Sequence, residues 1–483
     1  MDNYDSNTEK PISPPLTLSH DEMQSLGYHI VDMLIEHFEQ IREQSVTNKA
    51  TRPALETRLR EAVPQQGNTI ERVLEQTQRD VLDTIMHLDH PRFFAFVPGP
   101  SNFVSAMADA LASGFNIFAG TWLEASGPTQ IELVTIDWLR QICGLPDTAG
   151  GLFVSGGSVA NLTALATARH IILNDDTHNA IVYCSEQTHS SVVRALRILG
   201  FPASQVRILP TDKQFRLRFA DVQSTIVHDR NTGKRPFCII ASAGTTSTGS
   251  IDPLDELAEL CQREHLWLHV DGAYGAAAML SEQGRILLKG LERTDSLSLD
   301  PHKWLFQPYE MGCVLVKNAR WLKETFHILP EYLQDIDQGA EETNFCDYGI
   351  QLTRGTRALK LWMSLKIFGL DAFRQAIEHG IKLAEHAEAV LRASSSWDIV
   401  TPAHIGIITF RYAPTDCSCE EQEQINQQLV DALIQDGFAM LSSTVLHGRT
   451  TLRLCTINPR TTEEDIRATI ERLEYLGGNL LNE

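Results

Sequence analysis

Two residues whose side chains could take part in catalysis each follow an apolar stretch of the sequence. Lys303 comes shortly after the alternating run Ser296–Leu299, and Asp271 closes the run Leu266–Val270. If both runs are buried strands of one sheet, the two side chains can reach a common cleft. A lysine amine can hold an aldehyde cofactor covalently, and a buried carboxylate can keep a ring nitrogen of that cofactor protonated.

A glycine turn offers a place for a phosphate. The strand-like run Gly151–Ser155 leads through Gly156 and Gly157 to Ser158, where a helical pattern begins. Backbone amides at a helix N-terminus attract anions, and glycines let those amides approach closely. A tight turn capped by Ser158 is the alternative. No P-loop and no dinucleotide fingerprint is present, which disfavours nucleotides.

Further polar residues follow other strand-like runs. His189 comes after Ile181–Ser185 and could stack on a flat ring, although a histidine at such a position is more often a helix cap or a core residue when taken alone. Thr246 ends another run and could reach the edge of that ring, and His302 could hydrogen-bond a phosphate. Each signal is weak alone. Together with the lysine and the aspartate they indicate pyridoxal phosphate.

The middle of the chain alternates short apolar runs with helical stretches, from about residue 150 to residue 317. This alternation predicts an α/β fold with a mainly parallel sheet that is covered by helices on both faces. Ligands of such sheets bind at the carboxyl ends of the strands, where the polar residues above gather.

The regions before and after this alternating segment have different sequence patterns, which predict further domains. Residues 1–15 are polar and proline-rich and predict a disordered leader. Residues 16–88 are helical in pattern and form an N-terminal arm, whose apolar face packs either on a second subunit or on its own domain. Residues 89–371 form the large domain, and residues 372–483 form a small C-terminal α+β domain.

Composition narrows the class of function. The chain has 483 residues and a formal net charge of -21, with no basic block, which argues against nucleic acid and anionic membranes as partners. No apolar run approaches the ~20 residues that span a bilayer, and the N-terminus lacks a signal-peptide layout. The nine cysteines are scattered and predict no metal site. We expect a cytoplasmic protein.

Several blocks of this sequence resemble the group II pyridoxal-phosphate-dependent amino acid decarboxylases, in particular the aromatic-L-amino-acid decarboxylase branch. The resemblance runs from about Leu18 into the C-terminal domain and is carried by these blocks: His90–Ala95, Asp137–Leu139, Ser155–Ser158, Thr188–Ser191, Gly244–Thr246, His269–Tyr274, Pro301–Trp304 and Ala358–Trp362. It implies the aminotransferase-like fold type I, pyridoxal 5'-phosphate as cofactor, an amino acid substrate and a homodimer.

The resemblance also implies roles for individual residues. Lys303 corresponds to the lysine that binds the cofactor, Asp271 to the partner of its ring nitrogen, and His189 to the histidine that stacks on the ring. Gly157, Ser158 and His302 correspond to the residues that contact the phosphate. Ala273 corresponds to the residue against the other face of the ring, and Thr246 to a residue near the ring edge. Tyr332, in Pro330–Leu333, resembles the loop tyrosine that delivers a proton to the substrate carbon.

Departures from the family pattern leave the substrate open. Asp300 stands where the mammalian aromatic enzymes carry asparagine, and Gln351–Arg357 differs from the usual run, with Thr353 in place of a small residue beside the substrate ring. Ser126–Pro128 differs as well. The expected reaction is release of carbon dioxide from an L-amino acid, aromatic by preference. Alternatives are a 2,4-diaminobutyrate or glutamate decarboxylase, an aromatic aldehyde synthase, an aminotransferase, and an inactive cofactor-binding regulatory partner.

Overall fold

The structure is a computed structural model that describes residues 16–97, 99–328 and 342–481. It contains two compact units, of which one comprises the chain up to residue 44 together with residues 48–86. The other comprises residues 45–47 and everything from residue 87 onward.

The first unit is helical. Its helices are α1 (His20–Gln40), α2 (Arg52–Leu59) and α3 (Ile70–Asp80). Ser19 caps α1, because its side chain accepts from the backbone N–H of Glu22 while the Glu22 side chain accepts from the backbone of Ser19. None of the α1 residues is buried, although the helix carries several large apolar side chains.

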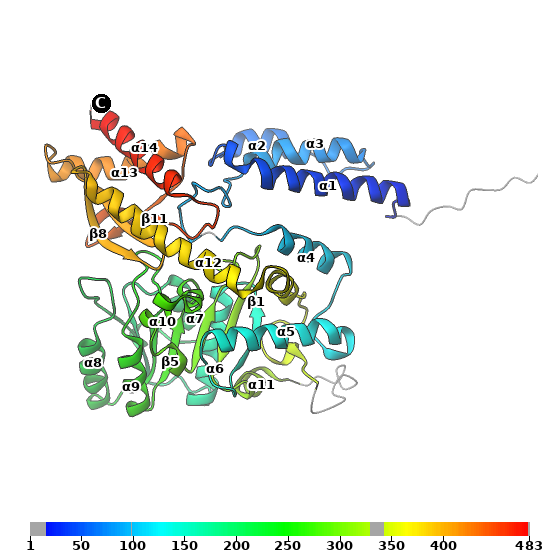
Figure 1. Cartoon of the computed structure of the whole chain (residues 1–483). Helices are drawn as coiled ribbons and strands as arrows, with labels where there is room; N and C mark the ends of the chain where they lie inside the picture. The colour runs from blue at the N-terminus through cyan, green and yellow to red at the C-terminus, as the bar shows by residue number, and fades with distance from the viewer. Residues whose placement is uncertain (1–15, 98, 329–341, 482–483) are drawn as a thin grey trace, which may run out of the picture. The chain divides into compact units, whose positions relative to one another are not determined.

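A seven-stranded sheet forms the centre of the second unit (Figure 1). Its strands stand in the order β1-β7-β6-β5-β4-β2-β3. Of these strands, β7 alone runs antiparallel to its neighbours, so the mainly parallel sheet predicted from the sequence is confirmed. The bounds are β1 (Gly150–Val154), β2 (Ala180–Ser185), β3 (Val206–Leu209), β4 (Arg235–Ser242), β5 (Trp267–Asp271), β6 (Ser296–Leu299) and β7 (Gly312–Val316).

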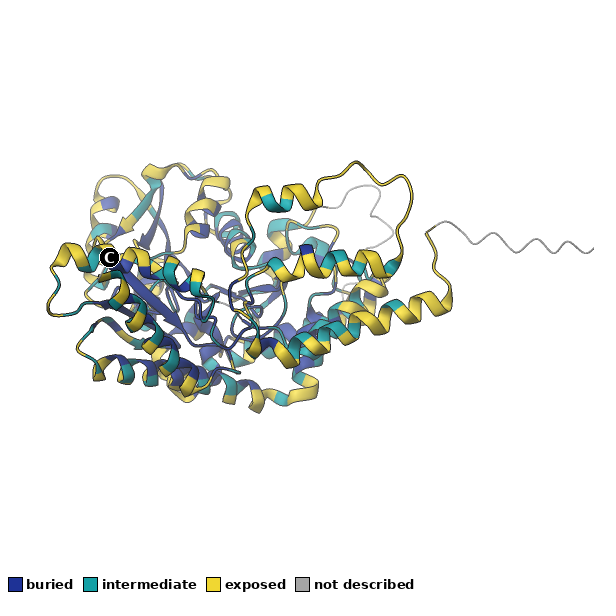
Figure 2. Ribbon diagram, turned by 90° about the horizontal axis from the view of Figure 1, so that it is seen from above, coloured by how far each residue is buried: buried dark blue, intermediate teal, exposed yellow. Residues whose placement is uncertain are grey.

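Helices cover both faces of this sheet, and its strands are largely buried as a result, except the edge strand β3 (Figure 2). Alternate residues of β2 and β4 therefore belong to different cores. Val182 and Ile240 pack with α6 (Gly157–Leu173) and α7 (Ser190–Ile198). Ile181 and Ile239 join the core that includes α8 (Phe219–Asn231) and α9 (Leu254–Glu264). This two-residue period explains why the runs are almost entirely apolar.

Longer helices frame the sheet. They are α4 (Phe103–Gly114), α5 (Trp122–Ile142) and α12 (Ala358–Ala393), and the short α10 (Glu282–Leu287) and α11 (Arg320–Phe326) lie between the later strands. The helical patterns of Thr356–Phe368 and Ala372–Ala393 predict two helices where α12 stands. The two segments are separated by a local break at Gly369, whose φ of 75° is readily adopted only by glycine.

A second, antiparallel sheet lies in the C-terminal part, in the order β10-β11-β9-β8. Its strands are β8 (Trp397–His404), β9 (Ile407–Tyr412), β10 (Ser442–Leu446) and β11 (Arg449–Cys455). Helices α13 (Cys419–Asp436) and α14 (Glu463–Leu481) pack on it with the end of α12 around one apolar core. The predicted smaller α+β part is therefore present. Within the described residues, we find no helix that is both long and apolar enough to cross a membrane.

Candidate active site

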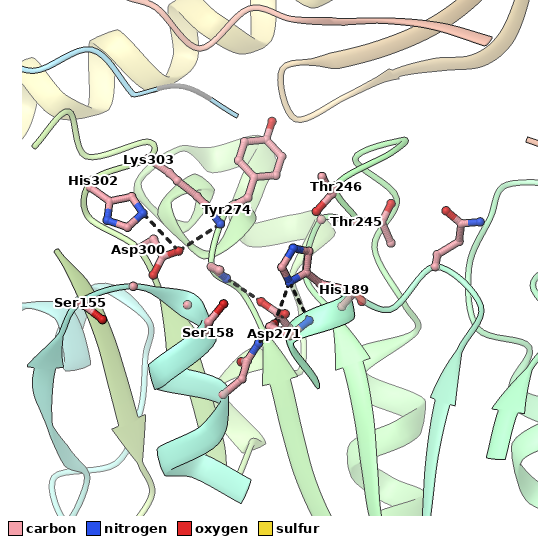
Figure 3. A pocket seen from close by; sticks show the side chains of 18 of the residues that line it. Ser155, Ser158, His189, Thr245, Thr246, Asp271, Tyr274, Asp300, His302 and Lys303 are labelled. Atoms are coloured by element: carbon pink, nitrogen blue, oxygen red, sulfur yellow. Dashed lines mark hydrogen bonds and ion pairs between the residues drawn. The ribbon is translucent and has the colours of Figure 1, made fainter. Parts of the chain in front are cut away.

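A cavity of about 290 Å³ lies at the carboxyl ends of the parallel strands. Residues from β4, β5 and the turn after β6 line it together with the N-termini of α6 and α7 (Figure 3). Most of the residues singled out from the sequence line this one cavity, namely Gly157, Ser158, His189, Thr246, Asp271, Ala273, His302 and Lys303. Tyr332 lies outside the described residues.

Asp271 ends β5 and is held by three hydrogen bonds. Its Oδ1 accepts from the backbone N–H of Ala273 at 3.2 Å and from the hydroxyl of Ser298 at 3.1 Å. Its Oδ2 accepts from the side-chain amide of Asn161 at 2.9 Å. Desolvation alone would raise the pKa of Asp271, but the charge of Lys303 and the Asn161 hydrogen bond outweigh it and hold the pKa below its ordinary value. The group is therefore a carboxylate at neutral pH.

Lys303 lies in the turn after β6 and faces a second carboxylate. Its Nζ lies 3.0 Å from Oδ2 of Asp300, whose side chain is only 2% exposed. Desolvation would lower the pKa of Lys303, but the charges of Asp300 and Asp271 reverse that effect and raise the pKa. In the free protein the amine is therefore a half-buried ammonium, paired with Asp300 and stabilised by the charge of Asp271.

The N-terminus of α6 forms a cradle beside this lysine. A Cβ added to Gly157 would stand 2.8 Å from Oδ2 of Asp300, and one added to Gly156 would stand 3.0 Å from the His302 ring. Only glycines leave room for a ligand group to approach the backbone here. Nδ1 of His302 accepts from the backbone N–H of Met311 at 3.0 Å, so its proton sits on Nε2.

His189 and Thr246 stand on the other side of the cavity (Figure 3). His189 precedes α7, and its Nδ1 accepts from the backbone N–H of Ser191 at 3.3 Å, so it caps the helix while its ring lines the cavity. Thr246 is exposed, and its carbonyl oxygen accepts from Nε of Arg453 in the C-terminal sheet at 2.6 Å. The expected helix cap and the expected cavity position of His189 thus coexist.

Other lining residues were not assigned a role from the sequence. They include Asn161, Ser191, Tyr274, Thr245 and Glu310. Asn161 lies one helical turn after Gly157, so the two residues share a face of α6. This spacing could have identified Asn161 from the sequence. Nothing in the local sequence singles out Glu310. Thr353 is exposed in the segment before α12.

These features fit pyridoxal phosphate. The group needs an amine for its aldehyde, a carboxylate for its ring nitrogen and amides for its phosphate, and the cavity presents all three. Asp271 is half-buried, accepts hydrogen bonds from three donors and carries the lowered pKa that this role requires. The glycine cradle at the start of α6 leaves the space that a phosphate occupies at a helix N-terminus.

Comparisons with known proteins agree with this chemistry. The family model described as "Pyridoxal-dependent decarboxylase conserved domain" matches residues 53–413. The chain is 50% identical to an aromatic-L-amino-acid decarboxylase of Bacillus atrophaeus over 96% of this chain and 97% of the relative. It is 29% identical to a phenylacetaldehyde synthase of Arabidopsis thaliana, over 92% of this chain and 94% of that relative.

A solved structure confirms the fold. The Oryza sativa TDC, crystallised with PLP and tryptamine, superposes with a TM-score of 0.92 at 27% identity and covers 97% of this chain and 100% of its own. The expected fold type I architecture and the expected cofactor are thereby confirmed. The chain belongs to the pyridoxal-dependent decarboxylases, enzymes that use pyridoxal phosphate to release carbon dioxide from amino acids.

Proposed function

We propose that this enzyme decarboxylates an aromatic L-amino acid to the corresponding amine. The observation that carries the proposal is the placement of Lys303 and Asp271 around one cavity, with Asp271 held as a carboxylate. The aromatic preference is supported by the relative from Bacillus atrophaeus that is named for such substrates, and by the tryptamine in the Oryza sativa structure.

In this proposal Lys303 binds the cofactor covalently and yields its place to the amine of the substrate. When bound, the cofactor's protonated ring withdraws the electron pair that the departing carboxylate leaves behind. Asp271 keeps that ring nitrogen protonated, because a carboxylate stabilises an adjacent positive charge. The hydrogen bonds from Asn161, Ser298 and Ala273 fix the position of this carboxylate.

The other lining residues position the cofactor. His189 would lie over one face of the ring and Ala273 over the other, with Thr246 near the ring edge. Gly157, Ser158 and His302 would hold the phosphate, the first two through the N-terminal end of α6. Tyr332 would protonate the substrate carbon after carbon dioxide has left.

An amino acid panel tests the substrate. We would incubate the purified holoenzyme with the twenty common amino acids, Dopa and 2,4-diaminobutyrate, and identify the products. Amines from tryptophan, tyrosine, phenylalanine or Dopa are expected. Turnover restricted to glutamate or 2,4-diaminobutyrate would contradict the aromatic assignment, and complete inactivity would favour a regulatory partner.

Aldehyde synthesis is a second candidate, because one relative in the same range of similarity is named a phenylacetaldehyde synthase. The same reaction mixtures separate the two activities. An aldehyde synthase consumes dioxygen and releases an aldehyde, ammonia and peroxide along with carbon dioxide, whereas a plain decarboxylase consumes no dioxygen and releases an amine. Tyr332 in the expected loop position favours the amine.

The protein is also proposed to be a cytoplasmic homodimer. All nine cysteines are free, and most are buried, which suits a reducing compartment. Helix α1 has no buried residue but exposes Met23, Tyr28, Ile30 and Ile35. Exposed apolar side chains grouped on one helix mark an interaction surface, and a second copy of this chain would cover it. The proposed division into a leader, an arm of residues 16–88, a large domain to residue 371 and a small domain gives the arm this role.

A further inference from the structure

A continuous chain of hydrogen bonds runs from the large sheet to His189, beneath the cavity. We call it the relay, and its members are, in order, Trp267, Ser296, His269, Asn161, Ser191 and His189. Every member except His189 is at most 2% exposed. Asp271 is attached to the relay through Asn161. Water therefore has little access to these bonds, and their donors and acceptors must match one another.

The hydrogen bonds at the Trp267 end of the relay have a fixed direction from donor to acceptor. The indole Nε1 of Trp267 can only donate, and it donates to Oγ of Ser296 at 2.8 Å. The Ser296 hydroxyl is then free to donate its own hydrogen to Nδ1 of His269 at 2.9 Å. Burial lowers the pKa of His269 to about 4, so this imidazole is neutral and carries its single proton on Nε2.

The attachment of Asp271 fixes the direction a second time. The carboxylate of Asp271 can only accept, so Asn161 must present its NH₂ group to it, at 2.9 Å. The carbonyl Oδ1 of Asn161 consequently faces Nε2 of His269 at 3.0 Å and requires a proton there. The requirements of Trp267 and Asp271 therefore agree, although they come from different ends of the relay.

The direction continues to His189. The second N–H of the Asn161 amide donates to Oγ of Ser191 at 2.9 Å. The Ser191 hydroxyl then donates to Nδ1 of His189 at 2.7 Å, and the Ser191 backbone N–H points at the same nitrogen from 3.3 Å. Because Nδ1 accepts both bonds, the proton of His189 sits on Nε2. The ring that carries this second nitrogen lines the cavity (Figure 3).

We propose that Asn161 and Ser191 are positioning residues of the active site, and that their directed hydrogen bonds keep His189 as an Nε2–H donor toward the bound ligand. One amide group of Asn161 serves Asp271 and Ser191 together, so it aligns both catalytic side chains. The inference rests on the roles proposed above for Asp271 and His189. It adds the protonation site of His189 and the residues that set it.

Neutron diffraction tests the relay directly. Crystals of the holoenzyme, exchanged into heavy water, reveal deuterium on individual ring nitrogens. The relay predicts deuterium on Nε2 of both His269 and His189 and none on Nδ1 of either residue. Deuterium on Nδ1 of either histidine would overturn it. This result is independent of turnover, so an inactive holoenzyme with the predicted deuterium positions would refute the proposed function and leave the relay intact.

Two variants separate the branches of the relay. Ser191→Ala removes the hydroxyl bond to His189 but leaves Asn161 on Asp271, so kcat should fall about tenfold while the absorption maximum of the bound cofactor stays unchanged. Asn161→Leu removes a donor from Asp271 as well, so it should also shift that maximum and weaken cofactor binding.

The matched control is Ser190→Ala, because Ser190 is the exposed neighbour of Ser191 at the start of α7. It should match the wild type in kcat and in the spectrum. Ser191→Thr restores a hydroxyl and should recover most of the lost kcat. An equal loss in Ser190→Ala and Ser191→Ala, or no loss in Ser191→Ala, would overturn the proposed role of Ser191.

Discussion

Lys303 stands between two acids, and this arrangement determines when its amine can react. The Nζ atom lies 3.0 Å from Asp300, and the charges of Asp300 and Asp271 raise its pKa. A protonated amine cannot attack an aldehyde, so each carboxylate makes cofactor attachment harder near neutral pH while it holds the amine in position. Asp300 therefore contributes to the pH dependence of cofactor attachment.

Replacing Asp300 tests this electrostatic role. Asp300→Asn should lower the pKa of Lys303, because an amide carries no charge to stabilise the ammonium. The measurement is the pH dependence of Lys303 acylation in the cofactor-free protein, followed by mass spectrometry. The acylation midpoint should move to lower pH. Asp295→Asn is the control, since Asp295 pairs with Lys317, 3.3 Å away. An unchanged midpoint for Lys303 would contradict the account.

At the residue scale the sequence was most informative where a side chain acts through its own chemistry. Lys303 and Asp271 each follow a buried strand, and a buried charge there needs a partner, which made both recognisable. Asn161 and Ser191 act through hydrogen bonds to partners far along the chain, such as Asp271. Those partners become visible only once the sheet and α6 are assembled.

A buried ion pair fixes the segment before α12 to the rest of the large sheet. Arg354 and Glu132 of α5 are at most 1% exposed in their side chains and approach to 2.6 Å. Arg354 also donates to the carbonyl oxygens of Ala119 and Phe153. Glu132 accepts in turn from the backbone N–H of Phe153 in β1 at 3.0 Å. Three segments that are distant in sequence are thus joined through one pair of charges.

Breaking this pair should be costly. Glu132→Ala leaves the Arg354 guanidinium buried without its carboxylate, and we expect a loss of about 3–5 kcal/mol in the free energy of unfolding. Urea denaturation followed by tryptophan fluorescence measures it. Glu124→Ala, in the exposed first turn of the same helix, should cost less than about 1 kcal/mol. Equal losses in the two variants would show that the ion pair contributes no special stability.

Tyr332, which lies outside the described residues, is proposed to decide the product. Tyr332→Phe should still release carbon dioxide but yield an aldehyde in place of the amine, because the phenolic proton donor is absent and dissolved dioxygen can oxidise the unprotonated substrate carbon. Product analysis by chromatography, with ammonia and peroxide assays, distinguishes the outcomes. Tyr475→Phe on α14 is the control, since Tyr475 is 57% exposed. If Tyr332→Phe makes the same amine as the wild type, the loop assignment is wrong.

At the element scale, strands with strong apolar runs were predictable and several others were not. All seven strands of the large sheet coincide with such runs. Helices bury both faces of the sheet except at the edge strand β3, where Ile208 stays exposed. β8 pairs with β9 through two register irregularities, and β10 alternates exposed and half-buried residues, so neither shows a strong pattern. α5 carries Pro128 in its interior and a non-helical Ala125, which obscures its periodicity.

At the scale of the whole molecule the proposed homodimer has a simple test. Light scattering coupled to size-exclusion chromatography should give twice the 54.0 kDa of one chain. Met23→Glu and Ile30→Glu together should lower that mass, because they place charges on the exposed apolar side of α1. Asp21→Lys, on the first turn of the same helix, controls for a change of charge. A wild-type mass of 54.0 kDa would contradict the dimer.

The measurement that tests the central claim most directly is the site of cofactor attachment. The holoenzyme is reduced with borohydride, which makes the bond between lysine and cofactor permanent, and is then digested and analysed by mass spectrometry. The account predicts the mass of one reduced pyridoxal phosphate on the peptide that contains Lys303, and none in Lys303→Ala, which should lose turnover by many orders of magnitude. A protein that stays colourless with the cofactor, or a modification at another lysine, would contradict it.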